Sequence, residues 1–195
     1  MVYVFIADGS EEIETVTPVD CLRRAGAGVK VVKVGAPGDL LITGSRGIKI
    51  CADIHEAALN SDNLADLDLE MIVLPGGAAG VENLYVSKVV ERVLAHCVAN
   101  NIKIGAICAA PSILARRGYL RGKKATSYPS FRHYLAENGA FVPEMPEVPE
   151  AVLEEPPVIT DGIFTTAWGM PVSIDFAFEL VKILKGEEAA AAIGR

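Results

Sequence analysis

Apolar residues in this chain occur in short runs rich in Val and Ile, separated by longer stretches with helical spacing. The short runs lie at 2–7, 29–34, 71–75 and 102–107, and they end in Gly, Pro or small residues. Such runs predict β-strands. Because they are apolar almost throughout, they favour a parallel sheet that is covered on both faces. The pattern therefore predicts an α/β fold, a three-layer αβα sandwich around a mostly parallel central sheet.

Helical patterns fill the stretches between these strands. The first helix is expected to begin at Pro18 with Thr17 as its cap, or earlier in the acidic run, and to end near Gly26 and Gly28. Further helices are predicted over 84–97, 109–120 and 171–184. The sequence has no internal repeat and no long linker, so residues 1–195 are expected to form a single domain.

Composition and charge exclude several function classes. Half of the chain is apolar (51%), and 25 acids against 18 bases give a net charge of −7. An acidic chain is a poor match for nucleic acid or for an anionic membrane surface. No apolar stretch is long enough for a membrane helix, and the first residues lack the basic region of a signal peptide. We therefore expect a cytoplasmic protein that binds neither nucleic acid nor membrane.

One acidic, proline-rich segment stands apart from the rest of the chain. Residues 143–157 carry five acids and no base, and Pro143, Pro146 and Pro149 follow a spacing of three. That spacing is typical of an extended polyproline II conformation. The segment is interpreted as a solvated surface excursion, with a partner-binding strip as the alternative.

Carboxylates follow the first predicted strand, where a dinucleotide-binding protein would carry a glycine-rich loop. The segment ADGSEEIET contains Asp8, Glu11, Glu12 and Glu14, which would repel a phosphate. Interaction with a helix N-terminus explains most such acids. The alternative is that one carboxyl turns inward to a site. Glu14 is the best candidate, because it lies past the charged turn between apolar neighbours.

A glycine pair and a cysteine follow the next strands in the chain. Gly76 and Gly77 in PGGAAG form either a tight turn or half of an oxyanion hole. Cys108 lies where a small-residue strand runs directly into a helix, as in the nucleophile elbow of hydrolases. A buried structural thiol is the alternative. Because N–H groups at a helix start stabilise a thiolate, this position predicts a lowered pKa and a reactive sulfur.

The other cysteines and the histidines form no metal-ligand cluster. Cys21 and Cys97 are predicted to be interior, and Cys51 to be partly exposed, with free thiols rather than disulfides. The histidines are isolated from one another in the sequence. His133 is slightly favoured for a catalytic role, because it follows the loop at 126–131.

Three motifs carry a resemblance to a known family. The segments GSEEIETVTPVD (9–20), VLPGG (73–77) and AICAAP (106–111) resemble the ThiJ/PfpI superfamily, in its DJ-one/YajL-like branch. SRGIKI (45–50), the DG-I-F-TT pattern at 161–166 and SIDFAFELVKIL support the match, which runs from about residue 2 to 190.

The resemblance implies a flavodoxin-like fold and a homodimer. It implies that Cys108 is the oxidisable nucleophile at the elbow and that Glu14 is its carboxyl partner, with the Gly77 and Ala109 N–H groups as the oxyanion hole. Members of the family are reported as glutathione-independent glyoxalases, as deglycases and as redox-responsive chaperones, and PfpI-type relatives as proteases.

Three departures from the family pattern concern the walls of the site. The protease-like branch has His after the nucleophile, where this chain has Ala109. A histidine-proline pair of a neighbouring branch is replaced by Tyr128 and Pro129. The G-P-G-T motif is replaced by GMPV at 169–172, next to Trp168. Gly76, Tyr128, Pro129 and Trp168 are predicted to form a site wall, which the last two departures alter.

These observations favour one function and leave two alternatives. The favoured function is a cofactor-free, metal-free conversion of small carbonyl substrates, methylglyoxal or glyoxal, to lactate or glycolate, of the glyoxalase or deglycase type. Cys108 would attack the aldehyde and Glu14 would move the proton. The first alternative is a redox-sensing or chaperone role that uses Cys108 oxidation. A protease or amidase has less support, because Ala109 cannot act as a base.

Overall fold

The computed structural model describes residues 1–59, 64, 67–143 and 158–194. Its strands are β1 (Val2–Ile6), β2 (Val29–Lys33), β3 (Leu41–Thr43), β4 (Lys49–Cys51), β5 (Ile54–His55), β6 (Met71–Leu74), β7 (Lys103–Ile107), β8 (Val158–Asp161) and β9 (Phe164–Ala167). Its α-helices are α1 (Glu12–Arg24), α2 (Ala78–Val86), α3 (Lys88–Ala99), α4 (Pro111–Arg116), α5 (Arg132–Glu137), α6 (Ser173–Lys185) and α7 (Glu187–Ile193). Short 3-10 helices are η1 (Glu56–Leu59), η3 (Pro129–Phe131) and η5 (Met170–Val172).

The central sheet has the strand order β5-β2-β1-β6-β7-β9-β8, and all neighbours are parallel except β8, which runs antiparallel to β9. The predicted strands 2–7, 29–34, 71–75 and 102–107 are confirmed as β1, β2, β6 and β7. Strands β3 and β4 form a separate antiparallel hairpin. The predicted α/β sandwich around a mostly parallel sheet is therefore confirmed.

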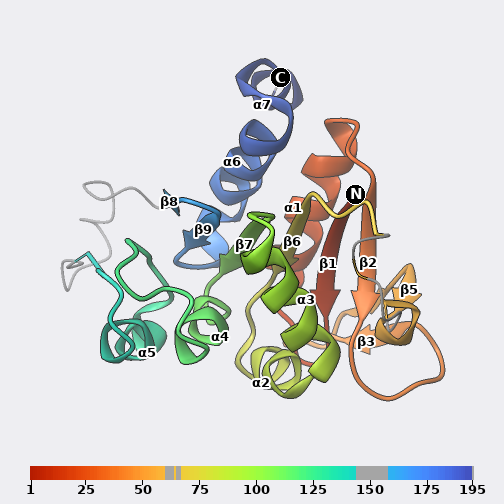
Figure 1. Ribbon diagram of the computed structural model, residues 1–195. Coiled ribbons are helices and arrows are strands. Elements are labelled where there is room, and N and C mark those ends of the chain that lie inside the picture. The colour runs from red at the N-terminus through yellow and green to blue at the C-terminus, as the bar shows by residue number, and fades with distance from the viewer. Residues whose placement is uncertain (60–63, 65–66, 144–157, 195) are drawn as a thin grey trace.

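Helices cover both faces of this sheet. Alternate residues of β1 enter two different cores: Tyr3 and Phe5 pack in one, whereas Val2, Val4 and Ile6 pack in the other. Helices α2 and α3 lie over the first face and α1 over the second (Figure 1). Helix α6 packs beside α1, and its buried Phe176 and Leu180 side chains lie against Gly105 of β7.

The first helix starts early, and the predicted start at Thr17 and Pro18 is wrong. The side chain of Glu11 accepts a 2.7 Å hydrogen bond from the Glu14 N–H and caps α1. Pro18 lies inside the helix, where its missing N–H leaves the Glu14 carbonyl without its helical donor. The alternative start in the acidic run is the one that the structure adopts.

Two other predicted helices are shorter or divided. Residues 84–97 belong to two helices, because Ser87 has an extended backbone and its hydroxyl caps α3 by accepting from Val90 N at 3.2 Å. The helix predicted over 109–120 is α4 alone, and Gly118 with φ of +78° terminates this region. The last predicted helix is found as η5 followed by α6, which ends at Lys185 with Gly186 as its C-cap.

The fold gathers the predicted chemistry at one edge of the sheet. Because β1, β6 and β7 are adjacent and parallel, the segments after their carboxyl ends lie side by side. These segments contain Glu14, the Gly76–Gly77 pair and Cys108. The acidic segment predicted at 143–157 lies outside the described residues, apart from Pro143.

Candidate functional site

A cavity of about 820 Å³ opens at this edge, and both Cys108 and Glu14 line it. Its further lining residues are Gly9, Glu11, Thr43, Gly44, Ser45, Arg46, Gly77, Ala78, Ala79, Ala109, Tyr128, Phe131, Trp168, Met170 and Pro171. These residues come from the loop after β1, the β3–β4 hairpin, and the segments after β6, β7 and β9. Separate parts of the sequence thus build one site.

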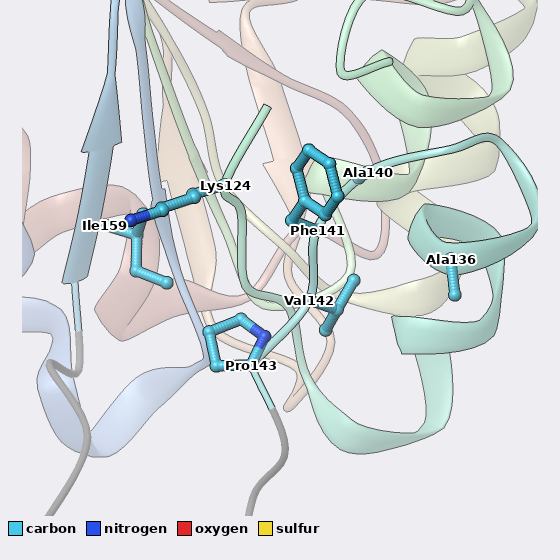
Figure 2. Close-up of a pocket in the computed structure, with 7 residues that line it drawn as sticks. All are labelled: Lys124, Ala136, Ala140, Phe141, Val142, Pro143 and Ile159. Carbon is cyan, nitrogen blue, oxygen red and sulfur yellow. The ribbon is translucent and has the colours of Figure 1, made fainter. Parts of the chain in front are cut away.

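A second cavity of about 620 Å³ lies between α5, Lys124 and β8. Figure 2 shows its lining residues, Lys124, Ala136, Ala140, Phe141, Val142, Pro143 and Ile159. None of these residues has a carboxylate or a thiol. The cavity at Cys108 is therefore the candidate functional site.

Cys108 occupies a strained elbow between β7 and α4. Its φ is +64°, in the left-handed region that residues other than glycine rarely adopt. Three main-chain hydrogen bonds hold it there: its N–H donates to Ala167 O at 2.9 Å, and its carbonyl accepts from Tyr128 N at 2.9 Å and from Ser127 Oγ at 2.6 Å. The half-buried thiol is thereby presented to the cavity.

Glu14 is the buried carboxyl beside this thiol. It lies in the first turn of α1, is 1% exposed, and accepts a 2.9 Å hydrogen bond from Gly76 N through Oε2. Its other oxygen, Oε1, is buried without a hydrogen-bond partner of normal geometry. Burial raises the pKa of Glu14 to about 7, with a further contribution from the charge of Glu11, while the Cys108 thiol and the Gly76 and Met170 backbones oppose the rise.

The environment of the sulfur differs from the sequence expectation. Burial and the neighbouring Glu14 carboxylate raise the pKa of the Cys108 thiol to about 12, whereas a lowered value was predicted from the helix start. The backbone N–H groups of Gly77 and Ala109 do point at the sulfur and lower its pKa, but they do not outweigh burial and charge. At neutral pH the site therefore holds a thiol next to a carboxyl that is close to half-ionised.

Gly76 and Gly77 are required by space. A Cβ on Gly76 would lie 2.6 Å from Cys108 Cβ and would also collide with Glu14 Oε2. Gly77 has φ of +86°, and a Cβ there would lie 2.7 Å from Glu11 N. The glycine pair lets the backbone approach both the acid and the thiol, as a close-contact turn requires.

Glu12, the first residue of α1, binds the β3–β4 hairpin. Glu12 is 5% exposed and accepts from Arg46 N at 2.7 Å, Ser45 Oγ at 3.1 Å and Ile48 N at 3.3 Å. These bonds fix the β3–β4 hairpin at the cavity mouth. Burial alone would raise the pKa of Glu12, but the hydrogen bonds outweigh it and hold the pKa below its usual value.

The predicted wall residues lie at different distances from the cavity. Tyr128 and Trp168 line it, Gly76 lies beneath it against Glu14 and Cys108, and Pro129 begins η3 without being one of the lining residues. His133 is exposed on α5 and stacks on Tyr134, with ring centroids 4.1 Å apart. His133 does not line the cavity, so the structure does not support a catalytic role for it.

Sequence reasoning missed several lining residues. Arg46 and Phe131 line the cavity without having been predicted as site residues, whereas Met170 belongs to the segment 169–172 that was predicted to alter the site wall. Residues 45–50 were noted only for their resemblance to the family, which was the available signal for Arg46. Of the other thiols, Cys21 and Cys97 are buried, as predicted, and Cys51, which was predicted to be partly exposed, is exposed.

In the part of the chain described above, no three or more His, Cys, Asp and Glu side chains group so that they could hold a metal ion. None of the helices described there has the length and apolar character needed to cross a membrane.

The fold and the site define a class of α/β proteins that carry a cysteine at a strand-to-helix elbow beside a buried carboxyl. The model of the DJ-1/PfpI family matches residues 1–183, and the chain belongs to this family. The resemblance drawn from the sequence motifs is thereby confirmed, and so is the flavodoxin-like fold that it implied.

Relatives match over nearly the whole chain. Protein dj-1beta of Drosophila melanogaster is 32% identical over 192 residues, covering 98% of this chain and 93% of its own. The crystal structure of Drosophila melanogaster DJ-1beta superposes with a TM-score of 0.85 at 30% identity, covering 99% of this chain and 94% of that one. The Schizosaccharomyces pombe protein named glutathione-independent glyoxalase DJ-1 is 30% identical over 162 residues, 83% of this chain and 82% of its own.

Proposed function

We propose that this protein converts 2-oxoaldehydes to 2-hydroxy acids without glutathione, with Cys108 as nucleophile and Glu14 as acid and base. The observation that carries the proposal is the contact between a buried carboxyl of pKa about 7 and a thiol, both packed against Gly76. A relative named as a glutathione-independent glyoxalase supports it. Deglycation of early glycation adducts would use the same two groups.

The first step is addition of the thiol to the aldehyde. The sulfur forms a bond to the aldehyde carbon, the ionised Glu14 accepts the thiol proton, and the carbonyl π electrons move to oxygen. The Gly77 and Ala109 N–H groups stabilise the negative oxygen. The oxygen then takes the proton from Glu14, which gives a hemithioacetal.

The second step moves a hydrogen between the two carbons. Glu14 removes the proton from the former aldehyde carbon, and the electron pair shifts to give an enediolate. Glu14 returns the proton to the neighbouring carbon, and the hydroxyl proton on the former aldehyde oxygen passes to the neighbouring oxygen, which leaves a thioester of a 2-hydroxy acid. Water then cleaves the thioester and regenerates the thiol. The sequence is an internal redox reaction that consumes only water, so it needs no external oxidant or reductant.

Release of lactate from methylglyoxal without glutathione tests this proposal. Wild type is compared with Cys108→Ala and Glu14→Gln, and lactate is measured because methylglyoxal loss also reports adducts on Arg and Lys. Turnover that disappears in both variants is the expected result. Lactate formation no higher than in the variants would overturn the proposal and would direct attention to peroxide oxidation of Cys108.

We also propose that the protein works as a cytoplasmic homodimer. Three apolar side chains of one face are well exposed: Ile13 (45%) and Val16 (48%) on α1, and Ile174 (59%) on α6. Ile13 and Val16 lie three residues apart, on the same side of the helix. Val16 and Ile174 line a common groove between the two helices. A second copy of the chain would cover this apolar face.

A further inference from the structure

Three aromatic side chains contribute to the lining of the Cys108 cavity. Tyr128, Phe131 and Trp168 all line it, and they come from the segment before α5 and the segment after β9. The two segments touch, since a Cβ on Gly169 would lie 3.3 Å from Cδ2 of the Tyr128 ring. We call Tyr128, Phe131 and Trp168 the aromatic wall.

The aromatic wall is fixed to the main chain of Cys108. The Cys108 N–H donates to Ala167, the residue directly before Trp168, at 2.9 Å. The Cys108 carbonyl accepts from the N–H of Tyr128, also at 2.9 Å. Both polar groups of the Cys108 backbone thus bond to the segments that carry the wall, so the main chain before Trp168 and at Tyr128 is held beside Cys108.

Trp168 presents carbon to the cavity. Its Nε1 is buried and has no hydrogen-bond partner, while the side chain as a whole is only partly buried and lines the cavity. The exposed part of the indole is therefore apolar. Such a surface favours planar, apolar groups that can stack on it.

Size and charge limit what could occupy the space. A volume of about 820 Å³ is within the range of about 300–1,000 Å³ for cavities that hold drug-sized ligands. A three-carbon ketoaldehyde leaves most of that space empty. The charged lining residues are the two acids Glu11 and Glu14 against the single base Arg46, so the lining offers no excess of positive charge to an anionic substituent.

We propose that the site prefers 2-oxoaldehydes with a neutral aryl substituent, stacked on the aromatic wall. This rests on the proposed function, because the Cys108 and Glu14 steps are the same. With phenylglyoxal the sulfur bonds to the aldehyde carbon, Glu14 carries the proton to the benzylic carbon, and water releases mandelate. Trp168 acts by binding the ring and takes no part in proton transfer.

Product formation from two substrates tests the preference. Mandelate from phenylglyoxal and lactate from methylglyoxal are measured without glutathione, and kcat/KM is compared. We expect wild type to favour phenylglyoxal by about tenfold, Trp168→Ala to lose most of that ratio, and Trp168→Phe to keep it. Phe141→Ala is the matched control, because Phe141 is an exposed aromatic residue in the other cavity (Figure 2).

The outcomes separate this inference from the function on which it rests. Turnover of methylglyoxal with no preference for phenylglyoxal, or an unchanged ratio in Trp168→Ala, overturns the aryl preference alone. Absence of both products in wild type overturns the proposed function and the preference with it.

A binding measurement on the wild-type protein covers the case of a variant that does not fold. Trp168 is the only tryptophan in the chain, so its fluorescence reports on the wall directly. The neutral product analogues mandelamide and lactamide serve as probes. We expect mandelamide to change the emission at about tenfold lower concentration than lactamide, and equal concentrations would overturn the preference.

Discussion

The N–H of Gly76 donates a 2.9 Å hydrogen bond to Oε2 of Glu14, and this contact sets how close the acid lies to the thiol. The Gly76 Cα has no room for a side chain, because an added Cβ would collide with Glu14 and lie 2.6 Å from Cys108 Cβ. The backbone of one residue thus packs against both reactive groups of the site.

Gly76→Ala is expected to lower the free energy of unfolding by about 1–3 kcal/mol, since the methyl group must displace buried neighbours. Lactate formation is expected to fall by at least about a hundredfold, because a displacement of about 1 Å is enough to misplace a catalytic group. Urea unfolding and the lactate assay measure the two effects. Gly118→Ala is the control: it meets open space at φ of +78°, so it adds backbone strain and leaves activity intact. Equal activity of Gly76→Ala and wild type would contradict the crowding described here.

Glu14 is expected to make the protein less stable as pH rises. Its pKa moves from 4.5 in the unfolded chain to about 7 in the folded protein, so the folded state holds more protons between these values. Stability is therefore highest below pH 4.5 with respect to this group, and falls by about 3 kcal/mol as pH rises through 7. Glu14→Gln is expected to remove this slope.

Urea unfolding of wild type and Glu14→Gln from pH 4.5 to 8.5 measures that difference. The exposed Glu137 provides a control, since Glu137→Gln is expected to keep the wild-type slope. A slope that persists in Glu14→Gln would show that another group is responsible for it.

The same ionisation predicts a pH dependence of catalysis. Glu14 must be ionised to accept the thiol proton, so kcat/KM for methylglyoxal is expected to rise about tenfold per pH unit below 7 and to level off above it. Initial rates of lactate release between pH 5 and 8.5 test this expectation. A flat profile across that interval would exclude Glu14 as the base.

Glu12 is expected to matter for stability through the β3–β4 hairpin. Glu12→Gln leaves one oxygen in place of two to accept from Arg46 N, Ser45 Oγ and Ile48 N, and is expected to cost about 1–3 kcal/mol. Because the pKa of Glu12 is lowered in the folded state, this stabilisation is present above pH 4.5 and is lost on acidification through the folded value. Amide exchange should quicken at residues 44–48 and stay unchanged in β9.

Val16→Asp is expected to produce a monomer. The substitution places a charge on the exposed face of α1 that the proposed homodimer covers. Sedimentation velocity at several concentrations measures the state of assembly. Val86→Asp is the control on α2, at an apolar side chain that is 69% exposed on a different element. A wild-type protein that sediments as a monomer throughout would contradict the proposal.

Much of the fold was predictable because the central strands are apolar on both faces. The runs at 2–7 and 102–107 could be identified without any knowledge of packing, and the latter placed Cys108 at a strand end. The β3–β4 hairpin was missed, since its short strands alternate exposed and buried or half-buried positions within three residues each. Arg46 remained unassigned for the same reason.

The roles of the neighbouring acids depended on the phase of a helix. Glu11, Glu12 and Glu14 carry the same chemical group, and the start of α1 at Glu12 decides their roles. Glu11 caps the helix, Glu12 binds the β3–β4 hairpin, and Glu14 faces the sulfur. The predicted direction of the Cys108 pKa shift was wrong, because the burial of the thiol and its proximity to the Glu14 charge arise from tertiary packing. Local position near a helix start could not reveal either effect.

The backbone at residue 108 keeps its left-handed shape through partners that lie elsewhere in the chain. The hydrogen bonds with Ala167, Ser127 and Tyr128 involve the backbone N–H and carbonyl of Cys108, not its side chain. None of these contacts therefore requires a sulfur atom. The backbone geometry of the elbow is thus independent of the side chain at residue 108. A hydroxyl or a selenol installed there would inherit the same acid and the same N–H donors, which makes this position suited to exchanging one nucleophile for another.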